Sequence, residues 1–216
     1  MSNLLEKVFE LIFPSVCGFC GKLDKNSLCA RCKNKLEKEL KERIEMVQDR
    51  NFSYLVYLFN YNGIIREKII AYKFNDMAHL SSTFAKFIIK NKKICGFLRK
   101  YDIIVPVPIH NKRKKERGYN QSELIARNIA DFTQLELASD VLMKTKNNTA
   151  QSSLNKADRQ NNVKNVYGIK NAEKIKNKRV VLIDDIYTTG STVNECSKIL
   201  KNAGASEIAV LVIAKD

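Results

Sequence analysis

The spacing of apolar residues changes repeatedly between a helical and a strand-like period in the chain beyond residue 51. Apolar residues three and four positions apart predict helices, whereas short continuous apolar runs predict strands buried on both faces. By this criterion, strands are expected at Tyr54–Phe59, Asp102–Pro108, Arg179–Ile183 and Ile208–Ala214, and helices at Ile64–Tyr72, Ser82–Lys90, Ser122–Phe132 and Thr192–Asn202. Strands that alternate with helices predict an α/β fold with a Rossmann-like, mainly parallel sheet.

The N-terminal part of the chain has a different pattern. Apolar residues recur at helical spacing over Met1–Phe13, and Lys and Glu alternate over Lys33–Gln48 at spacings that favour ion pairs within a helix. A cysteine-rich segment separates these two predicted helices. We expect a small module over residues 1–50 and a main domain over residues 51–216, with the boundary near Asp49–Asn51.

Composition narrows the class of protein. A chain of 216 residues with 44% hydrophobic residues can form one ordinary domain and a small appendage. Apolar runs such as Ile208–Ala214 are too short to span a bilayer. Met1–Phe13 contains two glutamates and no small-residue cleavage site, unlike a signal peptide. We therefore expect a soluble, cytoplasmic protein without membrane insertion.

The net charge of +15 is large for a chain of this length. Such a charge favours a polyanionic partner, either nucleic acid or a phosphorylated small molecule. A surface on which lysine is simply the preferred solvated residue explains the charge equally well. Only the placement of the basic residues can separate these interpretations.

Four of the six cysteines form two CxxC pairs with eight residues between them: Cys17, Cys20, Cys29 and Cys32. Two tight turns that each carry two thiolates can surround Zn²⁺ as a tetrahedron. Because all four positions are then filled by protein, the ion would be structural. A redox dithiol would need only one CxxC pair, and an iron–sulfur centre is not favoured by this spacing. We expect the two lone cysteines, Cys95 and Cys196, to be buried as small apolar residues.

Residues 180–192 read VVLIDDIYTTGST. An apolar run that predicts a strand is followed by two acids and then by a loop of hydroxyl residues and glycine, which leads into a predicted helix. The backbone amides at the start of the helix form a concave, partially positive site suited to a phosphate. The residues predicted to bind it are Thr188, Thr189, Gly190, Ser191 and Thr192. Asp184 and Asp185 supply acceptors beside that site, suitable for a ribose diol. The alternative is an ordinary strand-to-helix turn with a Ser or Thr cap.

This segment resembles the phosphoribosyl pyrophosphate (PRPP) signature of type I phosphoribosyltransferases, and the wider chain resembles the ComF family of competence proteins. Further stretches carry the resemblance: Ala71–Phe74, Val105–Pro108, Lys112–Gln121, and a polar stretch with Gln151, Leu154, Arg159 and Asn162. With the four cysteines, the similarity covers nearly the whole chain. It implies a sheet of the type I phosphoribosyltransferase kind behind a small N-terminal zinc-ribbon module.

The resemblance also implies roles for particular residues. Pyrophosphate would lie against the loop that follows Val105–Pro108, whose candidate contacts are Lys112, Arg113, Arg117 and Gly118. Mg²⁺ would bridge pyrophosphate and the ribose hydroxyls. Asp184 and Asp185 would hold those hydroxyls beside an oxocarbenium-like cation, as in glycoside cleavage.

The polar stretch Leu142–Lys170 has little periodicity and predicts a long loop flanked by short strands. Part of it, Thr145–Asn162, would close over the site and exclude water. Gln151 and Arg159 are its candidate ligand contacts.

Two functions follow from the resemblance. One is transfer of a phosphoribosyl group from PRPP to an unknown acceptor, with release of pyrophosphate, in a protein of natural competence. The other is a non-catalytic transformation protein that binds single-stranded DNA and uses the phosphate site only for ligand binding. The implied partners are PRPP or a related phosphosugar, single-stranded DNA and the helicase machinery of competence. The basic residues of Lys112–Arg117 fit a solvated surface loop as well as a phosphate or nucleic-acid contact.

Overall fold

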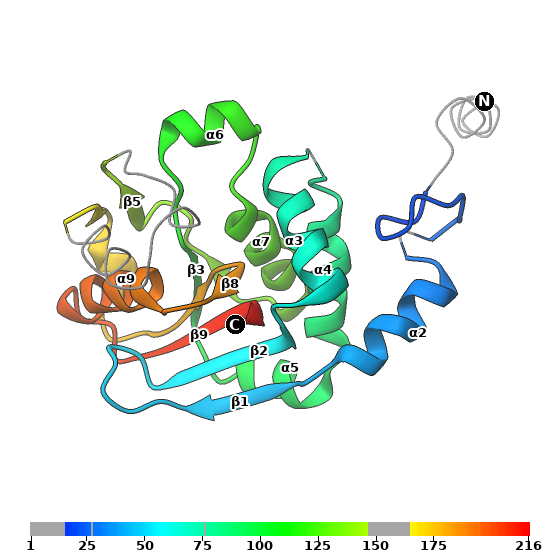
Figure 1. Ribbon diagram of the computed structural model, residues 1–216. Coiled ribbons are helices and arrows are strands. Elements are labelled where there is room, and N and C mark those ends of the chain that lie inside the picture. The colour runs from blue at the N-terminus through cyan, green and yellow to red at the C-terminus, as the bar shows by residue number, and fades with distance from the viewer. Residues whose placement is uncertain (1–15, 27, 76, 147–164) are drawn as a thin grey trace, which may run out of the picture. The chain divides into compact units, whose positions relative to one another are not determined.

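The computed structural model describes residues 16–26, 28–75, 77–146 and 165–216 (Figure 1). The predicted helix at Met1–Phe13 lies outside these ranges. The chain divides into two compact units, Met1–Leu40 and Lys41–Asp216. This division precedes the boundary expected near residues 49–51.

The described part of the first unit is a cysteine-bearing turn followed by a helix. Val16 and Leu23 form an antiparallel bridge around the turn. Helix α2 then covers Ala30–Glu39 and buries Leu36. A segment this small has few apolar side chains to bury, so a bound metal is a plausible source of its stability.

The helix predicted over Lys33–Gln48 is wrong in its second half. Helix α2 ends at Glu39, and Arg43–Met46 forms strand β1, which pairs antiparallel with β2 (Tyr54–Asn60). The Glu45 carboxylate accepts a hydrogen bond from the Tyr57 hydroxyl at 2.6 Å and forms an ion pair with Lys215 at 2.7 Å. These contacts with residues distant in sequence outweigh the local helical propensity.

Within the described residues, the second unit contains a seven-stranded sheet in the order β1-β2-β9-β7-β3-β4, with β8 paired to β9. The strands after β2 are β3 (Ile103–Pro106), β4 (Glu136–Leu137), β7 (Arg179–Ile183), β8 (Ile186–Tyr187) and β9 (Glu207–Lys215). All pairings in this sheet except β1–β2 are parallel. The predicted α/β fold with a mainly parallel sheet is confirmed.

Helices cover both faces of this sheet (Figure 1). The helices of the second unit, within the described residues, are α3 (Gly63–Phe74), α4 (Leu80–Lys90), α5 (Lys92–Leu98), α6 (Asn111–Arg117), α7 (Gln121–Thr133), α9 (Ser191–Asn202) and the 3₁₀ helix η2 (Ala172–Ile175). On one face, Val193, Cys196 and Leu200 of α9 join a core cluster with alternate strand residues. The intervening strand residues, including Val181, are also fully buried. This two-sided burial explains the continuous apolar runs in the sequence.

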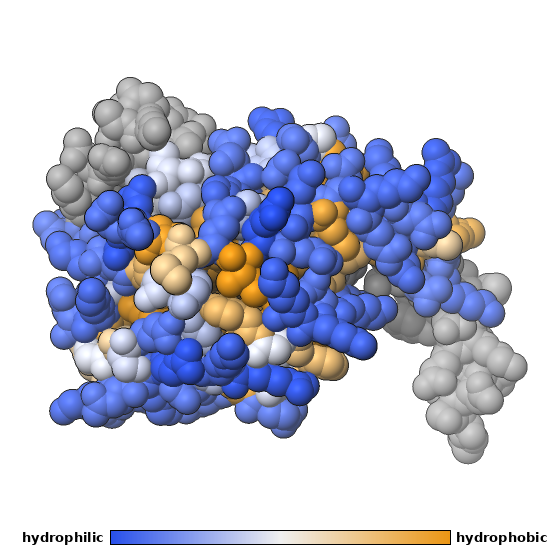
Figure 2. Space-filling model, turned by 90° about the horizontal axis from the view of Figure 1, so that it is seen from below, coloured by the Kyte–Doolittle hydropathy of each residue, from blue (hydrophilic) through white to orange (hydrophobic). Residues whose placement is uncertain are grey.

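Hydrophilic side chains predominate among the described residues on one face of the molecule. Figure 2 shows one face on which polar side chains surround separate apolar patches. No helix in the described ranges combines the length and apolar character that a membrane span requires.

Candidate functional site

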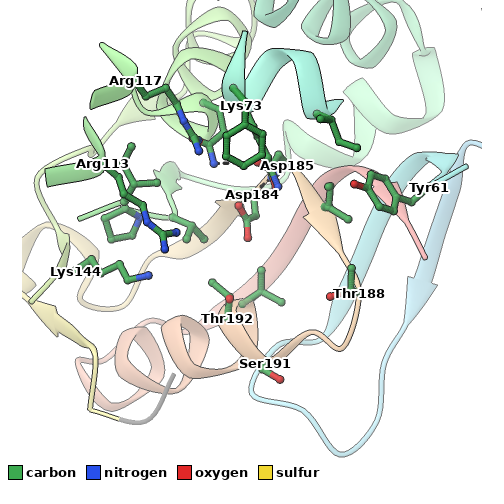
Figure 3. Close-up of a pocket in the computed structure, with 18 of the residues that line it drawn as sticks. Tyr61, Lys73, Arg113, Arg117, Lys144, Asp184, Asp185, Thr188, Ser191 and Thr192 are labelled. Atoms are coloured by element: carbon green, nitrogen blue, oxygen red, sulfur yellow. Dashed lines mark hydrogen bonds and ion pairs between the residues drawn. The ribbon is translucent and has the colours of Figure 1, made fainter. Parts of the chain in front are cut away.

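A cleft of about 1110 Å³ opens at the carboxyl ends of the central strands, where parallel α/β sheets place their ligands (Figure 3). Its walls come from the end of β7, the start of α9, helix α6, the end of α3 and the hairpin of β5 (Leu142–Lys144) and β6 (Tyr167–Ile169). Segments far apart in the sequence therefore contribute side chains to one space.

The two adjacent acids follow β7 directly but have different surroundings. Asp185 is 3% exposed, and its two carboxylate oxygens contact Lys73 Nζ and Gln121 Nε2, each at 2.9 Å. Asp184 is only partly buried and lines the cleft. Its Oδ1 accepts hydrogen bonds from Ser122 Oγ at 3.0 Å and from the Asp185 backbone N–H at 2.9 Å. Both acids line the cleft, and Asp184 is the less buried of the two.

Asp184 titrates in an unusual range for an aspartate. Burial and the adjacent charge of Asp185 raise the pKa of Asp184 to about 7, although Lys73 and the two hydrogen bonds oppose the rise. Two carboxylates so close together resist simultaneous ionisation. Asp184 therefore changes its charge near neutral pH.

The predicted phosphate loop lies beside Asp184 at the start of α9. Gly190 has φ +72° and immediately precedes the helix, and its carbonyl accepts the Asn194 N–H at 2.9 Å. The hydroxyls of Thr189 and Ser191 are 2.8 Å apart, which stabilises the turn. All five predicted residues, 188–192, line the cleft. The N-terminal amides of α9 thus begin at the cleft, as a phosphate site requires.

The basic segment forms a helix instead of the loop that the sequence suggests. His110 Nδ1 accepts the Lys112 N–H at 3.2 Å at the start of α6, and Gly118, with φ +82°, ends it. Arg113 and Arg117, four residues apart on one helix face, line the cleft together with Gly118. Lys112 is exposed and is not among the lining residues. Helical geometry thus separates Lys112 from its predicted partners.

The four N-terminal cysteines converge as predicted. Their Sγ atoms all lie within 4.8 Å of one another, and those of Cys20 and Cys29 are 3.7 Å apart. Tetrahedral Zn²⁺ with Zn–S bonds of about 2.3 Å requires S···S distances of about 3.8 Å. Cys17 lies on a turn closed by its carbonyl and the Gly21 N–H at 2.8 Å, whereas Cys32 lies in the first turn of α2. Structural zinc fits these ligands.

Comparison with known proteins agrees with these observations. The model of the phosphoribosyl transferase domain matches residues 120–216. The chain is 28% identical to competence protein F of Haemophilus influenzae over 94% of this chain and 85% of that protein. It is also 28% identical to competence protein ComFC of Streptococcus pneumoniae, over 97% and 85% of the two chains. DNA utilization protein YhgH of Escherichia coli K12 is 26% identical over 74% and 71%.

The chain is thus similar to ComF competence proteins over most of its length. Its second unit has the type I phosphoribosyltransferase fold that the sequence predicts. The region that matches the domain model begins at the residue before α7 and includes the acid pair and the loop at α9. The elements that complete the cleft, α3 and α6, precede it.

Sequence reasoning missed several residues that line the cleft. Lys73 belongs to a stretch that supported the resemblance but received no role, and Gln121 ends another. Lys144, at the end of β5, lies 5.5 Å from the ring centroid of Tyr167. Burial lowers the pKa of the Lys144 ammonium, and the positive charge of Arg113 lowers it further. Only the tertiary structure identifies these residues as part of the site, because it brings them together in the cleft.

The predicted loop contacts Gln151 and Arg159 lie outside the described residues. The short strands expected around that stretch are confirmed, because β5 and β6 pair antiparallel from Leu142↔Ile169 to Lys144↔Tyr167. Both Lys144 and Tyr167 line the cleft. The two lone cysteines, Cys95 and Cys196, are buried as expected.

Proposed function

We propose that this chain binds PRPP or a closely related phosphosugar, with Mg²⁺, in the cleft, and that it acts in the processing of transforming DNA. The observation that carries the proposal is the position of Asp184 between two sites for anions. The start of α9 lies on one side, and Arg113 and Lys144 extend from the other (Figure 3).

The cleft matches the three parts of such a ligand. The helix start at 188–192 suits a terminal phosphate because its amides are donors. Asp184 suits ribose hydroxyls because its outer oxygen can accept their hydrogen bonds. Arg113 and Arg117 suit the diphosphate because guanidinium groups pair bidentately with phosphate oxygens.

Mg²⁺, when bound with the ligand, would neutralise diphosphate charge. In transfer, the bond from ribose C1 to diphosphate oxygen breaks and a bond from C1 to the acceptor forms. Ionised Asp184 would hold the ribose close to the developing positive charge, and the arginines would stabilise the departing diphosphate. The walls of the cleft would limit the access of water.

Calorimetric titration with Mg²⁺-PRPP tests the proposal. We expect binding to the wild-type chain and at least a tenfold loss in Asp184→Asn, because the ionised acceptor is removed. Asp140→Asn is the matched control, since Asp140 is an exposed acid paired with Lys174 and lies away from the cleft residues. Absence of binding to the wild-type chain would reject the function.

The second candidate is the non-catalytic role in which the protein binds single-stranded DNA. It is favoured by the exposed Lys112, Lys114 and Lys115 of α6, although Lys114 also forms an ion pair with Glu123 at 3.1 Å. The names of the relatives in Haemophilus influenzae and Escherichia coli refer to competence and DNA utilization. Pyrophosphate release with a panel of nucleobase and amine acceptors separates the candidates. Release with any acceptor establishes transfer, whereas DNA binding without release favours the second candidate.

A further inference from the structure

Lys73 makes an ionic contact with the acid pair but has no place in the ligand contacts proposed above. It lies near the end of α3, and its ammonium is 2.9 Å from Asp185 Oδ1. The side chain of Lys73 is 21% exposed and that of Asp185 is 5% exposed. An ion pair this buried is weakly screened by water and strongly affects neighbouring charges.

Asp185 is held from both sides. Gln121 Nε2 donates to its second carboxylate oxygen at 2.9 Å, and the Gln121 carbonyl accepts from the Tyr72 hydroxyl at 2.7 Å. Arg117 in turn donates to Gln121 Oε1. Both oxygens of Asp185 therefore have protein partners, whereas Asp184 faces the cleft.

The charge of Asp185 bears directly on Asp184. The two residues are adjacent, and the Asp185 N–H donates to Asp184 Oδ1 at 2.9 Å. Asp185 raises the pKa of Asp184, and Lys73 lowers it. Other groups that act on this acid pair come from the surrounding elements: Ser122 of α7, Lys144 of β5, Tyr167 of β6, Cys196 of α9 and Arg117 of α6.

We propose that Lys73 is a positioning residue that acts through Asp185, keeping Asp184 ionised and correctly oriented for the phosphosugar. Lys73 neutralises the inner acid, so the outer acid carries the negative charge that meets the ribose. The two acids then have different roles, with Asp185 as the anchor and Asp184 as the ligand contact. This inference rests on the proposed function.

A double-mutant cycle tests whether Lys73 acts through Asp185 or touches the ligand itself. The variants are Lys73→Met, Asp185→Asn and the combination of both, titrated with Mg²⁺-PRPP at pH 7. Asn at position 185 retains an oxygen acceptor for Gln121 but carries no charge. Residues coupled in this way give non-additive effects, whereas independent contacts give additive ones.

We expect Lys73→Met alone to weaken binding about fivefold at pH 7, since a rise of about one unit in the pKa of Asp184 lowers its ionised fraction from about a half to about a tenth. Part of this loss should be recovered at pH 8.5. In the Asp185→Asn background, Lys73→Met should change the affinity by less than about twofold. Lys73→Arg should keep the binding near that of the wild type.

Two results would overturn the inference: an equal loss from Lys73→Met in both backgrounds, or complete loss of binding in Asp185→Asn alone. Lys73→Met alone leaves Asp185 without its ionic partner and could fail to fold. In that case the comparison of Asp185→Asn with the combined variant still tests whether Lys73 touches the ligand itself. In that comparison the well-buried carboxylate is absent from both variants, and only the partly exposed Lys73 ammonium of Asp185→Asn loses its ionic partner.

Carbon-13 NMR titration of the aspartate carboxyls without ligand separates this inference from the proposed function. The midpoint of Asp184 should rise in Lys73→Met and fall in Asp185→Asn. An unchanged midpoint in both would contradict the inference even if PRPP binds. The expected shifts without any PRPP binding would reject the function and leave the electrostatic coupling intact.

Discussion

The ring of Tyr187 occupies the space that a side chain on Gly190 would need. A Cβ added to Gly190 would lie 2.5 Å from Tyr187 Cζ, and Gly190 has φ +72°. The ring cannot move away freely, because it packs edge-on against Phe52 with their centroids 6.5 Å apart. The turn before α9 therefore depends on glycine for two reasons, backbone conformation and close approach.

Gly190→Ala should lower the free energy of unfolding by about 1–3 kcal/mol and weaken phosphosugar binding at least tenfold. Thermal unfolding and calorimetric titration measure the two effects. Gly96→Ala is the control, because Gly96 is exposed within α5 and an added Cβ there meets nothing within 4 Å. It should be neutral or stabilising by up to about 1 kcal/mol. Equal behaviour of the two variants would contradict a special role for the turn.

Asp184→Asn should stabilise the protein at pH 8 while it weakens ligand binding at least tenfold. The pKa of Asp184 is raised in the folded state to about 7, so the folded state binds this proton more tightly than the unfolded state does. Stability from this group is present below its unfolded pKa and decreases as pH rises through about 7.

The gain from Asp184→Asn should be about 1–2 kcal/mol at pH 8, reduced by the partial access of water, and should vanish near pH 4. Thermal melts across this pH range measure it. Asp140→Asn should show the opposite sign, because the hydrogen bond from Lys174 lowers the pKa of Asp140. A lower melting temperature for Asp184→Asn at pH 8 would show that the raised pKa is wrong.

Chelation should remove one zinc ion per chain and unfold the segment around α2. Cys20→Ser should weaken zinc binding by orders of magnitude, because structural zinc sites couple binding to folding. Zinc release with a colorimetric chelator and circular dichroism measure these effects. Cys95→Ser is the control, since Cys95 is buried in the second unit and should leave the zinc content unchanged. Equal zinc content in both variants would contradict the four-cysteine site.

Neutralising Lys112, Lys114 and Lys115 together should weaken single-stranded DNA binding and reduce its salt dependence by about two units of slope, from loss of about three phosphate contacts. Fluorescence anisotropy at several salt concentrations measures this. Three other exposed lysines, Lys176, Lys198 and Lys201, give a control variant of the same net charge. If both variants lose the same affinity, the effect comes from overall charge and not from α6.

The same triple variant should retain PRPP binding if Arg113 and Arg117 are the diphosphate contacts. These arginines line the cleft together with Lys115, whereas Lys112 and Lys114 do not, so the double variant of Lys112 and Lys114 is the stricter test of the same assignment. Loss of PRPP binding without loss of DNA binding would reverse this assignment.

Local signals in the sequence determined much of this protein. The cysteine spacing predicted a convergent four-thiol site, and continuous apolar runs predicted β7 and β9, because these features depend on residues close together in the chain. The positions of the acids and of residues 188–192 at the edge of the sheet were also predictable, since a buried strand followed by a glycine turn and a helix places them there.

Only the tertiary structure decided the rest, because it depends on contacts between distant residues. Arg43–Met46 forms a strand because its backbone pairs with β2 and Glu45 forms an ion pair with Lys215, although the charged residues around it favour a helix. The different surroundings of Asp184 and Asp185 likewise follow from Lys73 of α3 and from Gln121, 64 residues away from Asp185. Two identical side chains in adjacent positions can be told apart only by what the fold places against each of them.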